Sequence, residues 1–259
     1  MRTGKTWLTS IFIFLAFAQV APADDPATAK TEPVDPSGSW QWEYSFNDNP
    51  AKFSLKLEWD GKELAGKYTA FNNTSDIEET KFTSDNKLSF VSTREFNGNE
   101  FVVHFDGEAK PEEIVGTVAV DFGEGPREFD WTAKRVVEVD DVLGVWEIKV
   151  ETPQGVVEPQ ITITRDGDKL HGDYVSPFGE REAKEVVLKD GELSWTIESN
   201  DDDDFDFQVI YRGKPLGNKI AGTGEFDFGG NTGEMDFTGE RTPPEEKAST
   251  ESAEPKTEE

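Results

Sequence analysis

Two segments of this chain carry the same landmarks at a constant spacing of 106 residues, so the chain holds two copies of one unit. A Gly-x-Trp triplet opens each segment, at Gly38–Trp40 and Gly144–Trp146, and an arginine ends each one, Arg135 or Arg241. The matches in between are Asp60-Gly61 with Asp166-Gly167, Gly66 with Gly172, Tyr68 with Tyr174, Phe101 with Phe207, and Asp121-Phe122-Gly123 with Asp227-Phe228-Gly229. Each copy is near the usual size of a small domain.

Inside each copy the hydrophobic pattern has a period of two, which is typical of β-strands. In the first copy Trp40, Trp42 and Tyr44 alternate with polar residues, and Asp-Gly or Asn-Gly pairs mark the turns between such runs. We predict about eight strands in each copy. In the first copy they lie near 39–46, 53–59, 64–71, 76–82, 88–95, 100–108, 113–122 and 127–135.

Short connections and even strand spacing favour an antiparallel meander, and closing a meander removes its exposed edges. The predicted fold is therefore all-β, with two tandem small antiparallel up-and-down β-barrels of about eight strands each. An open two-sheet sandwich is the competing fold, because it has the same alternation, although it usually needs longer crossover connections.

The Gly-x-Trp that opens each copy, together with the arginine that ends it, resembles the signature of the calycin superfamily, which includes lipocalins, fatty-acid-binding proteins and avidins. The stretch Val142-Leu143-Gly144-Val145-Trp146 looks most like the start of a lipocalin barrel. The resemblance implies a closed barrel in which the tryptophan packs across the floor and the arginine lies over it. Each copy is shorter than a typical lipocalin, and no C-terminal helix follows.

Strand parity leads to the same contact without the resemblance. Trp40 shares the inward face of its strand, and Arg135 shares the face of Phe129 and Trp131. Because the first and last strands of a closed barrel pair, a cation can stack on an indole in each copy. Gly38, Trp40, Arg135, Gly144, Trp146 and Arg241 are therefore interpreted as structural residues that hold the barrels closed.

Outside the repeats the chain divides by composition. Residues 1–23 read as a secretory signal peptide, with a basic start, an apolar run and the small residues Ala21-Pro22-Ala23; a membrane anchor is the rival interpretation. We assign 24–37 to a disordered linker, 38–135 and 144–241 to the two barrels, 136–143 to a connector, and 242–259 to a disordered acidic tail. Cutting within 136–143 should release two independently folding domains.

The absence of cysteine predicts an exported bacterial protein, periplasmic or extracellular, whose barrels are stable without disulfides. The formal net charge is −28, which disfavours nucleic acid and anionic lipid surfaces as partners. Solubility explains this charge, and recognition of a cationic partner is the alternative. The sequence leaves the oligomeric state open.

The interior of a barrel is the natural place for a small ligand. In the first copy the predicted inward set is rich in rings, which favours a filled core: Trp40, Trp42, Tyr44, Phe53, Trp59, Tyr68, Phe90, Phe101, Phe105, Phe122 and Trp131. The second copy has smaller residues at several matching positions, such as Ile148 for Trp42. A small apolar or aromatic ligand is therefore sought first in the second barrel, beside Tyr174, Trp195, Phe207 and Tyr211.

No catalytic set, cofactor motif or metal motif is recognised. Asp201, Asp202, Asp203 and Asp204 form a weak calcium candidate, but the run lacks the EF-hand pattern and is interpreted as a solvated loop tip. His104 and His171 have outward parity and lie in different copies, so neither a metal pair nor a general base is predicted. No nucleophile motif is present.

The sequence therefore predicts an exported, non-enzymatic binding or interaction protein built from two calycin-like barrels, with a small apolar or aromatic molecule as one ligand class. The alternative is a structural or protein–protein interaction module of the cell envelope with filled barrels. A hydrolase that uses exposed carboxylates is the third hypothesis.

Overall fold

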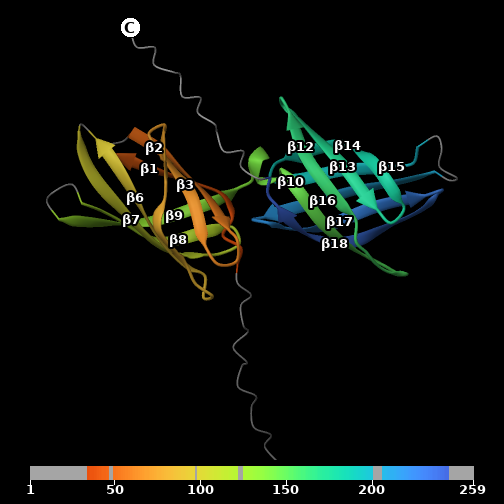
Figure 1. Cartoon of the computed structure of the whole chain (residues 1–259), viewed down its shortest axis with the longest axis horizontal. Coiled ribbons are helices and arrows are strands. Elements are labelled where there is room, and N and C mark those ends of the chain that lie inside the picture. Colours follow the sequence, from red (N-terminus) through yellow and green to blue (C-terminus); the bar gives the residue numbers. More distant parts are fainter. Residues whose placement is uncertain (1–33, 47–48, 97, 122–124, 201–205, 245–259) are drawn as a thin grey trace, which may run out of the picture. The chain divides into compact units, whose positions relative to one another are not determined.

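The computed structural model describes residues 34–46, 49–96, 98–121, 125–200 and 206–244. These residues form an all-β structure of two antiparallel barrels, each made from one nine-stranded sheet (Figure 1). The predicted fold class is confirmed, and the sandwich alternative is wrong, because each sheet wraps round on itself.

Nine strands build the first barrel: β1 (Gly38–Phe46), β2 (Asn49–Trp59), β3 (Leu64–Ala70), β4 (Asn73–Asp76), β5 (Glu78–Phe82), β6 (Lys87–Phe96), β7 (Asn99–Ala109), β8 (Glu113–Asp121) and β9 (Pro126–Val136). Their order in the sheet is β4-β3-β2-β1-β9-β8-β7-β6-β5. Neighbours in sequence are neighbours in the sheet, as in a meander, apart from the β1–β9 closure and the break between β4 and β5.

A single 3₁₀ turn, η1 (Val139–Asp141), precedes the second barrel. The strands of that barrel are β10 (Gly144–Thr152), β11 (Gly155–Val157), β12 (Gln160–Asp166), β13 (Lys169–Ser176), β14 (Gly179–Lys189), β15 (Glu192–Glu198), β16 (Phe207–Leu216), β17 (Lys219–Phe228) and β18 (Asn231–Thr242). Their order is β11-β10-β12-β13-β14-β15-β16-β17-β18, and β10 also pairs with β18.

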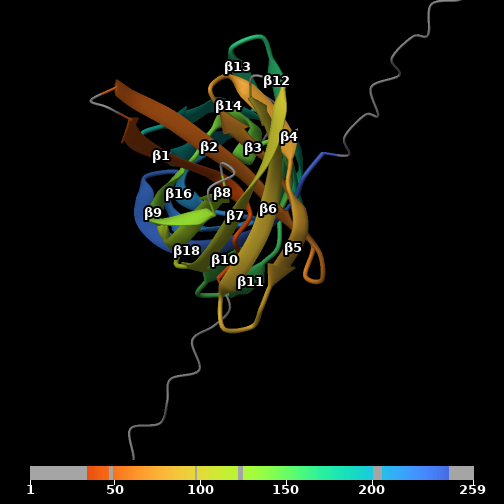
Figure 2. The same cartoon turned by 90° about the vertical axis from the view of Figure 1, so that its left-hand side faces the viewer.

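The second barrel is closed by backbone pairing, whereas the first is nearly closed. β10 pairs with β18 over Val145–Val150, while β1 pairs with β9 only over Ser39–Gln41. In the first barrel β4 pairs with β3, and β5 pairs with β6. Figure 2 shows β4, β5 and β6 on one side of this barrel. The seam of the first barrel therefore lies where the chain passes from β4 to β5.

The strand predicted near 76–82 corresponds to β5, but the structure has an additional short strand, β4, directly before it. Ile77 separates them, and its N–H donates to the carbonyl of Gly66 at 3.0 Å. A β-bulge follows in β5, where Glu79 adopts a φ of 50°. The equivalent Glu185 in the unbroken β14 has the same φ at the same bulge, so the bulge belongs to the repeat.

Buried aromatic and aliphatic side chains fill both barrels, at the inward positions that the alternation predicts. The largest fully buried side chains of the first barrel are Trp40, Leu55, Leu57, Phe105, Ile114 and Trp131, and those of the second are Trp146, Ile148, Ile161, Ile163, Trp195 and Phe237. Tyr44 was expected inside, but its ring is 38% exposed. The reason is its position near the end of β1, beyond the residues that pair with β9.

The first barrel begins earlier than expected, because Val34–Ser37 packs against it. Ser37 is 1% exposed, and its hydroxyl accepts the N–H of Trp59. The carbonyl of Pro36 accepts the indole N–H of Trp40 at 3.0 Å. Residues 1–33, which include the predicted signal peptide, lie outside the described residues, as do Asp201–Asp204 and the tail from 245.

Candidate functional site

The predicted contact between the first and last strands is present in the first barrel. Trp40 faces Arg135 across the β1–β9 pair, and the guanidinium carbon lies 4.1 Å from the centre of the ring. Arg135 also donates to the carbonyls of Asp35, Ser37 and Pro111. Burial lowers the pKa of Arg135 to about 10, so the group is still protonated at neutral pH.

The second barrel has the same contact with a longer distance and different acceptors. Arg241 lies 5.7 Å from the ring of Trp146 and donates through two nitrogens to the side-chain oxygen of Asn218, at 3.1 and 2.8 Å. Its third nitrogen reaches the carbonyls of Asp140 and Leu143. Each guanidinium nitrogen of these two arginines donates to its barrel or to the segment just before it, so these contacts hold the barrels shut.

The residues proposed as a ligand site in the second barrel form part of its packed core. Trp195 and Tyr211 are 1% and 3% exposed and stack at 5.0 Å, and the hydroxyls of Tyr174 and Tyr211 lie 3.4 Å apart. Burial raises the pKa of both tyrosines. Phe207 is only half-buried and lies under the guanidinium of Arg181 at 5.0 Å. Tyr174, Trp195 and Tyr211 are thus in contact within the core, and Phe207 packs against it.

The first barrel is filled in the same way. Trp42 stacks on Phe53 and Tyr68 at 5.6 and 5.7 Å, and meets Phe105 and Trp131 edge-on. Such offset-stacked and edge-on pairs stabilise a core beyond the area they bury. The interior of each barrel is therefore occupied by its own rings.

One polar group in each core lacks an acceptor. The indole N–H groups of Trp131 and Trp195 are buried and have no hydrogen-bond partner. An unpaired buried donor costs about 1–3 kcal/mol. Each indole N–H could therefore donate to an acceptor atom that entered the core.

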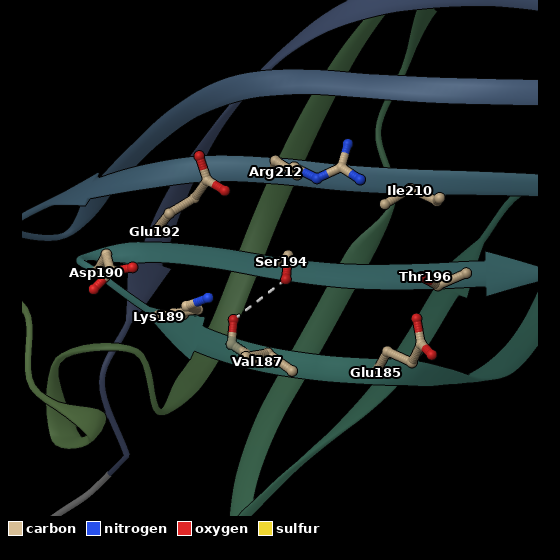
Figure 3. A pocket seen from close by; sticks show the side chains of 9 residues that line it. All are labelled: Glu185, Val187, Lys189, Asp190, Glu192, Ser194, Thr196, Ile210 and Arg212. Atoms are coloured by element: carbon tan, nitrogen blue, oxygen red, sulfur yellow. Dashed lines mark hydrogen bonds between the residues drawn. The ribbon is translucent and has the colours of Figure 1, made fainter.

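An open hollow with a volume of about 680 Å³ lies on the outer face of the second barrel. It is open to solvent and crosses β14, β15 and β16 (Figure 3). Its lining mixes acidic, basic, hydroxyl and apolar side chains: Glu185, Val187, Lys189, Asp190, Glu192, Ser194, Thr196, Ile210 and Arg212.

The β-bulge of β14 lies at this hollow. Between Lys184 and Val187 the ladder with β15 is interrupted, and Glu185 and Val187 come from that stretch. Bulges bend a strand and increase its twist. The hydroxyl of Ser194 then reaches back to the carbonyl of Val187 at 3.5 Å, a contact that Figure 3 draws. The alternation pattern does not reveal this hollow, because it gives no sign of a bulge.

Exposed apolar side chains gather at one end of the second barrel. Strand directions alternate, so the β10–β11, β13–β14 and β17–β18 connections lie at the end opposite the Trp146–Arg241 contact. Phe178 is 77% exposed, Val156 62%, Val175 43% and Phe228 42%. We call this end, with its flanking side chains, the distal rim. Sequence reasoning missed it, although an aromatic residue inside the turn Pro177-Phe178-Gly179 was a visible signal.

No cluster of side chains that could hold a metal ion is present in the described part of the chain. No group of three or more histidine, aspartate or glutamate side chains converges there on a common point. His104 and His171 are exposed, as their parity predicts. The described residues contain no helix that is long and apolar enough to cross a membrane.

Comparison with known proteins gives little further guidance. No family model matches the chain, and no curated protein matches its sequence. A solved structure from Bacteroides fragilis, described as a "putative outer membrane protein", matches with 12% identity over 80% of this chain and 95% of that chain. The TM-score is 0.28, so this match carries no argument about function.

Proposed function

We propose that this protein is an exported, non-enzymatic interaction protein whose two barrels act through their outer surfaces and hairpin ends. The observation that supports this best is the contrast between inside and outside. Within each barrel the aromatic rings pack against one another and fill the interior. The 680 Å³ hollow, in contrast, is on the outer face of β14–β16. The calycin-like clamps Trp40–Arg135 and Trp146–Arg241 serve closure, and leave the outside available for partners.

A second candidate is the binding of a small apolar or aromatic molecule inside the second barrel. The specific observation in its favour is the buried indole N–H of Trp195, which has no acceptor. A ligand there would have to displace the packed rings of Trp195 and Tyr211, and it would accept that hydrogen bond. This candidate therefore requires the core to open.

One experiment separates the two candidates, because the chain has no cysteine and a single thiol can be introduced at will. An environment-sensitive dye on Ser194→Cys reports the outer hollow, while intrinsic tryptophan fluorescence reports the cores. A matched dye on Thr117→Cys, exposed on β8 of the first barrel, is the control. Fatty acids, small aromatics, oligosaccharides and charged peptides are then titrated.

We expect at least one polar probe class to change the Ser194→Cys signal saturably, with the Thr117→Cys signal and the tryptophan signal unchanged. A saturable tryptophan response to apolar ligands, with no response at Ser194→Cys, would establish the ligand-carrier candidate instead. Export is tested separately. The mature protein from a bacterial host should begin at Asp24, and retention of residues 1–23 would contradict cleavage.

A further inference from the structure

Both barrels present an exposed phenylalanine on equivalent hairpins. Phe71 lies between β3 and β4 and is 70% exposed, and Phe178 lies between β13 and β14 and is 77% exposed. Large aromatic side chains at this exposure are uncommon in a soluble protein, and they mark interaction sites when they gather with other apolar groups.

The turn at Phe71 is unfavourable for a bulky side chain. Phe71 and Asn72 have φ values of 50° and 62°, which is the two-residue hairpin turn that normally takes asparagine and glycine. A residue with a side chain is strained in this region of backbone conformation. Phe71 offsets part of that strain by packing edge-on against Phe53 at 5.5 Å, so it also covers the end of the first barrel.

The two ends differ in charge. At the distal rim of the second barrel the exposed apolar residues are flanked by exposed carboxylates, namely Glu151, Glu158, Glu180, Asp206 and Asp227. The equivalent positions of the first barrel hold Ser45, Lys52, Thr74, Glu100 and Asp121. The rim of the second barrel therefore carries five acidic side chains where the first carries two acidic and one basic.

Two cations of the described rim already have partners within it. Arg181 stacks on Phe207, and Lys149 pairs with Glu158 at 3.8 Å. Aromatic faces and carboxylates together attract cations, because a guanidinium or ammonium group gains from both the ring quadrupole and the opposite charge. The net charge of −28 adds long-range attraction for a basic partner and repels anionic lipid.

Exposed apolar side chains and exposed carboxylates thus occur together at this end. From this we infer that the distal rim of the second barrel docks a basic peptide segment that also carries apolar side chains. Phe178 is the central contact, with the exposed Val175 of the same hairpin, and Glu151 and Glu180 receive the lysine or arginine groups. The inference rests on the proposed function and names the partner class for one part of the outer surface.

The test uses the full mature chain and three labelled peptides of equal length that alternate leucine with lysine, glutamate or serine, read by fluorescence anisotropy. We expect saturable binding of the lysine peptide only. Phe178→Ser should weaken it about tenfold, since a central aromatic anchor contributes most of the affinity of such contacts. Glu151→Gln and Glu180→Gln should each weaken it about threefold and reduce its salt dependence.

Phe71→Ser is the matched control, because it removes an equally exposed ring from the rim that lacks the acidic flank. It should change the affinity less than twofold. An equal loss in Phe71→Ser and Phe178→Ser, or unchanged binding in Phe178→Ser, would overturn the inference. So would binding of phosphatidylcholine vesicles that depends on Phe178, because the partner would then be a lipid surface.

Failure of this inference and failure of the proposed function give different results. If no peptide binds the rim but the Ser194→Cys dye responds to a probe, the rim inference is wrong and surface interaction stands. If neither site responds and apolar ligands change the tryptophan signal saturably, both proposals are wrong.

Discussion

In the second barrel β14 runs unbroken from Gly179 to Lys189 and pairs with strands on both sides, whereas the same stretch of the first barrel divides into β4 and β5. Side chains close the resulting seam. Arg94 on β6 donates to the carbonyls of Tyr68 and Asn73 at 2.8 and 3.0 Å and lies 4.4 Å over the ring of Tyr68. The hydroxyls of Ser75 and Ser92 meet across the same gap at 3.1 Å.

This difference shows that one repeated frame tolerates two ways of closing a sheet. Backbone pairing closes the second barrel, so its side chains at that position are free to vary. In the first barrel closure depends on a few side chains, and Arg94 is partly buried for that purpose, which lowers its pKa. We expect the first barrel to be the more sensitive to single substitutions.

The cores differ by an exchange of two rings. In the first barrel Phe90 on β6 meets Trp131 on β9 edge-on at 6.0 Å. In the second barrel Trp195 on β15 meets Phe237 on β18 edge-on at 5.5 Å. The large and small rings have changed places between equivalent strands, which keeps the packed volume similar.

The largest predicted effect concerns the two closing arginines. Arg135→Ala should lower the free energy of unfolding by about 3 kcal/mol, because it leaves the carbonyls of Asp35, Ser37 and Pro111 without a charged donor. Arg241→Ala should cost about 2 kcal/mol, since its ring contact is longer. Hydrogen exchange resolved by strand measures each barrel separately. Equal losses would contradict this ranking.

The exchanged rings give a double-mutant test of the cores. Phe90→Trp alone overfills the first barrel and Trp131→Phe alone underfills it, so each should cost about 1–3 kcal/mol. The double variant recreates the arrangement of the second barrel and should recover to within about 1 kcal/mol of the parent. Denaturant unfolding measures all three, and strictly additive losses would show that the exchange is not compensatory.

Removing the seam contact should have a smaller and local effect. Arg94→Ala should destabilise the first barrel by about 1–2 kcal/mol, because two carbonyls lose a charged donor. Amide exchange should accelerate in β3, β4 and β6 and remain unchanged in β13–β15. Uniform acceleration across both barrels would mean that Arg94 does not act at the seam.

The smallest effect concerns a salt bridge of the first barrel, between positions whose charges are reversed in the second barrel. Glu113 faces Lys134 in the first barrel, and Lys219 faces Glu240 at the equivalent positions of the second. The hydrogen bonds from Lys134 and Lys110 hold the pKa of Glu113 below its usual value. Its contribution is thus present above the unfolded pKa and is lost as the pH falls through the lowered folded value.

Either single change, Glu113→Lys or Lys134→Glu, should therefore lower the stability of the first barrel slightly at neutral pH. The double reversal should recover only part of that loss, because Lys110, which also pairs with Glu113 at 3.1 Å, would then face a lysine. Thermal unfolding between acidic and neutral pH gives the comparison. If the melting temperature of each single variant falls with acidic pH as it does in the parent, the ion pair contributes nothing measurable to stability. That result is common for exposed ion pairs.

Much of this architecture is visible in the sequence. The spacing of 106 residues and the two-residue period lead to the repeat, the barrel class and the Trp40–Arg135 contact, because each depends only on parity along a strand. The break at Ile77 and the bulges at Glu79 and Glu185 are different. The bulges depend on positive φ values at Glu79 and Glu185, which glutamate rarely adopts, and no local sequence pattern predicts them.

The candidate sites show the same division. The interior position of Trp195 and Tyr211 follows from alternation, but whether the space between such rings is empty depends on packing across strands distant in sequence. The outer hollow and the distal rim arise from a bulge and from the way several hairpins meet at one end. Phe178 could have been noticed as an aromatic residue in a turn, but its acidic neighbours come from four other parts of the chain.

The most direct test of the central claim, that filled barrels act through their outside, is an amide and indole NMR titration of the full mature chain. The lysine–leucine peptide and a small aromatic ligand are added in turn. We predict that the peptide shifts the amides of Phe178 and Glu180 saturably, and that the indole signal of Trp195 moves with neither ligand. A saturable shift of the Trp195 indole with the aromatic ligand, while the rim amides stay fixed, would contradict the account.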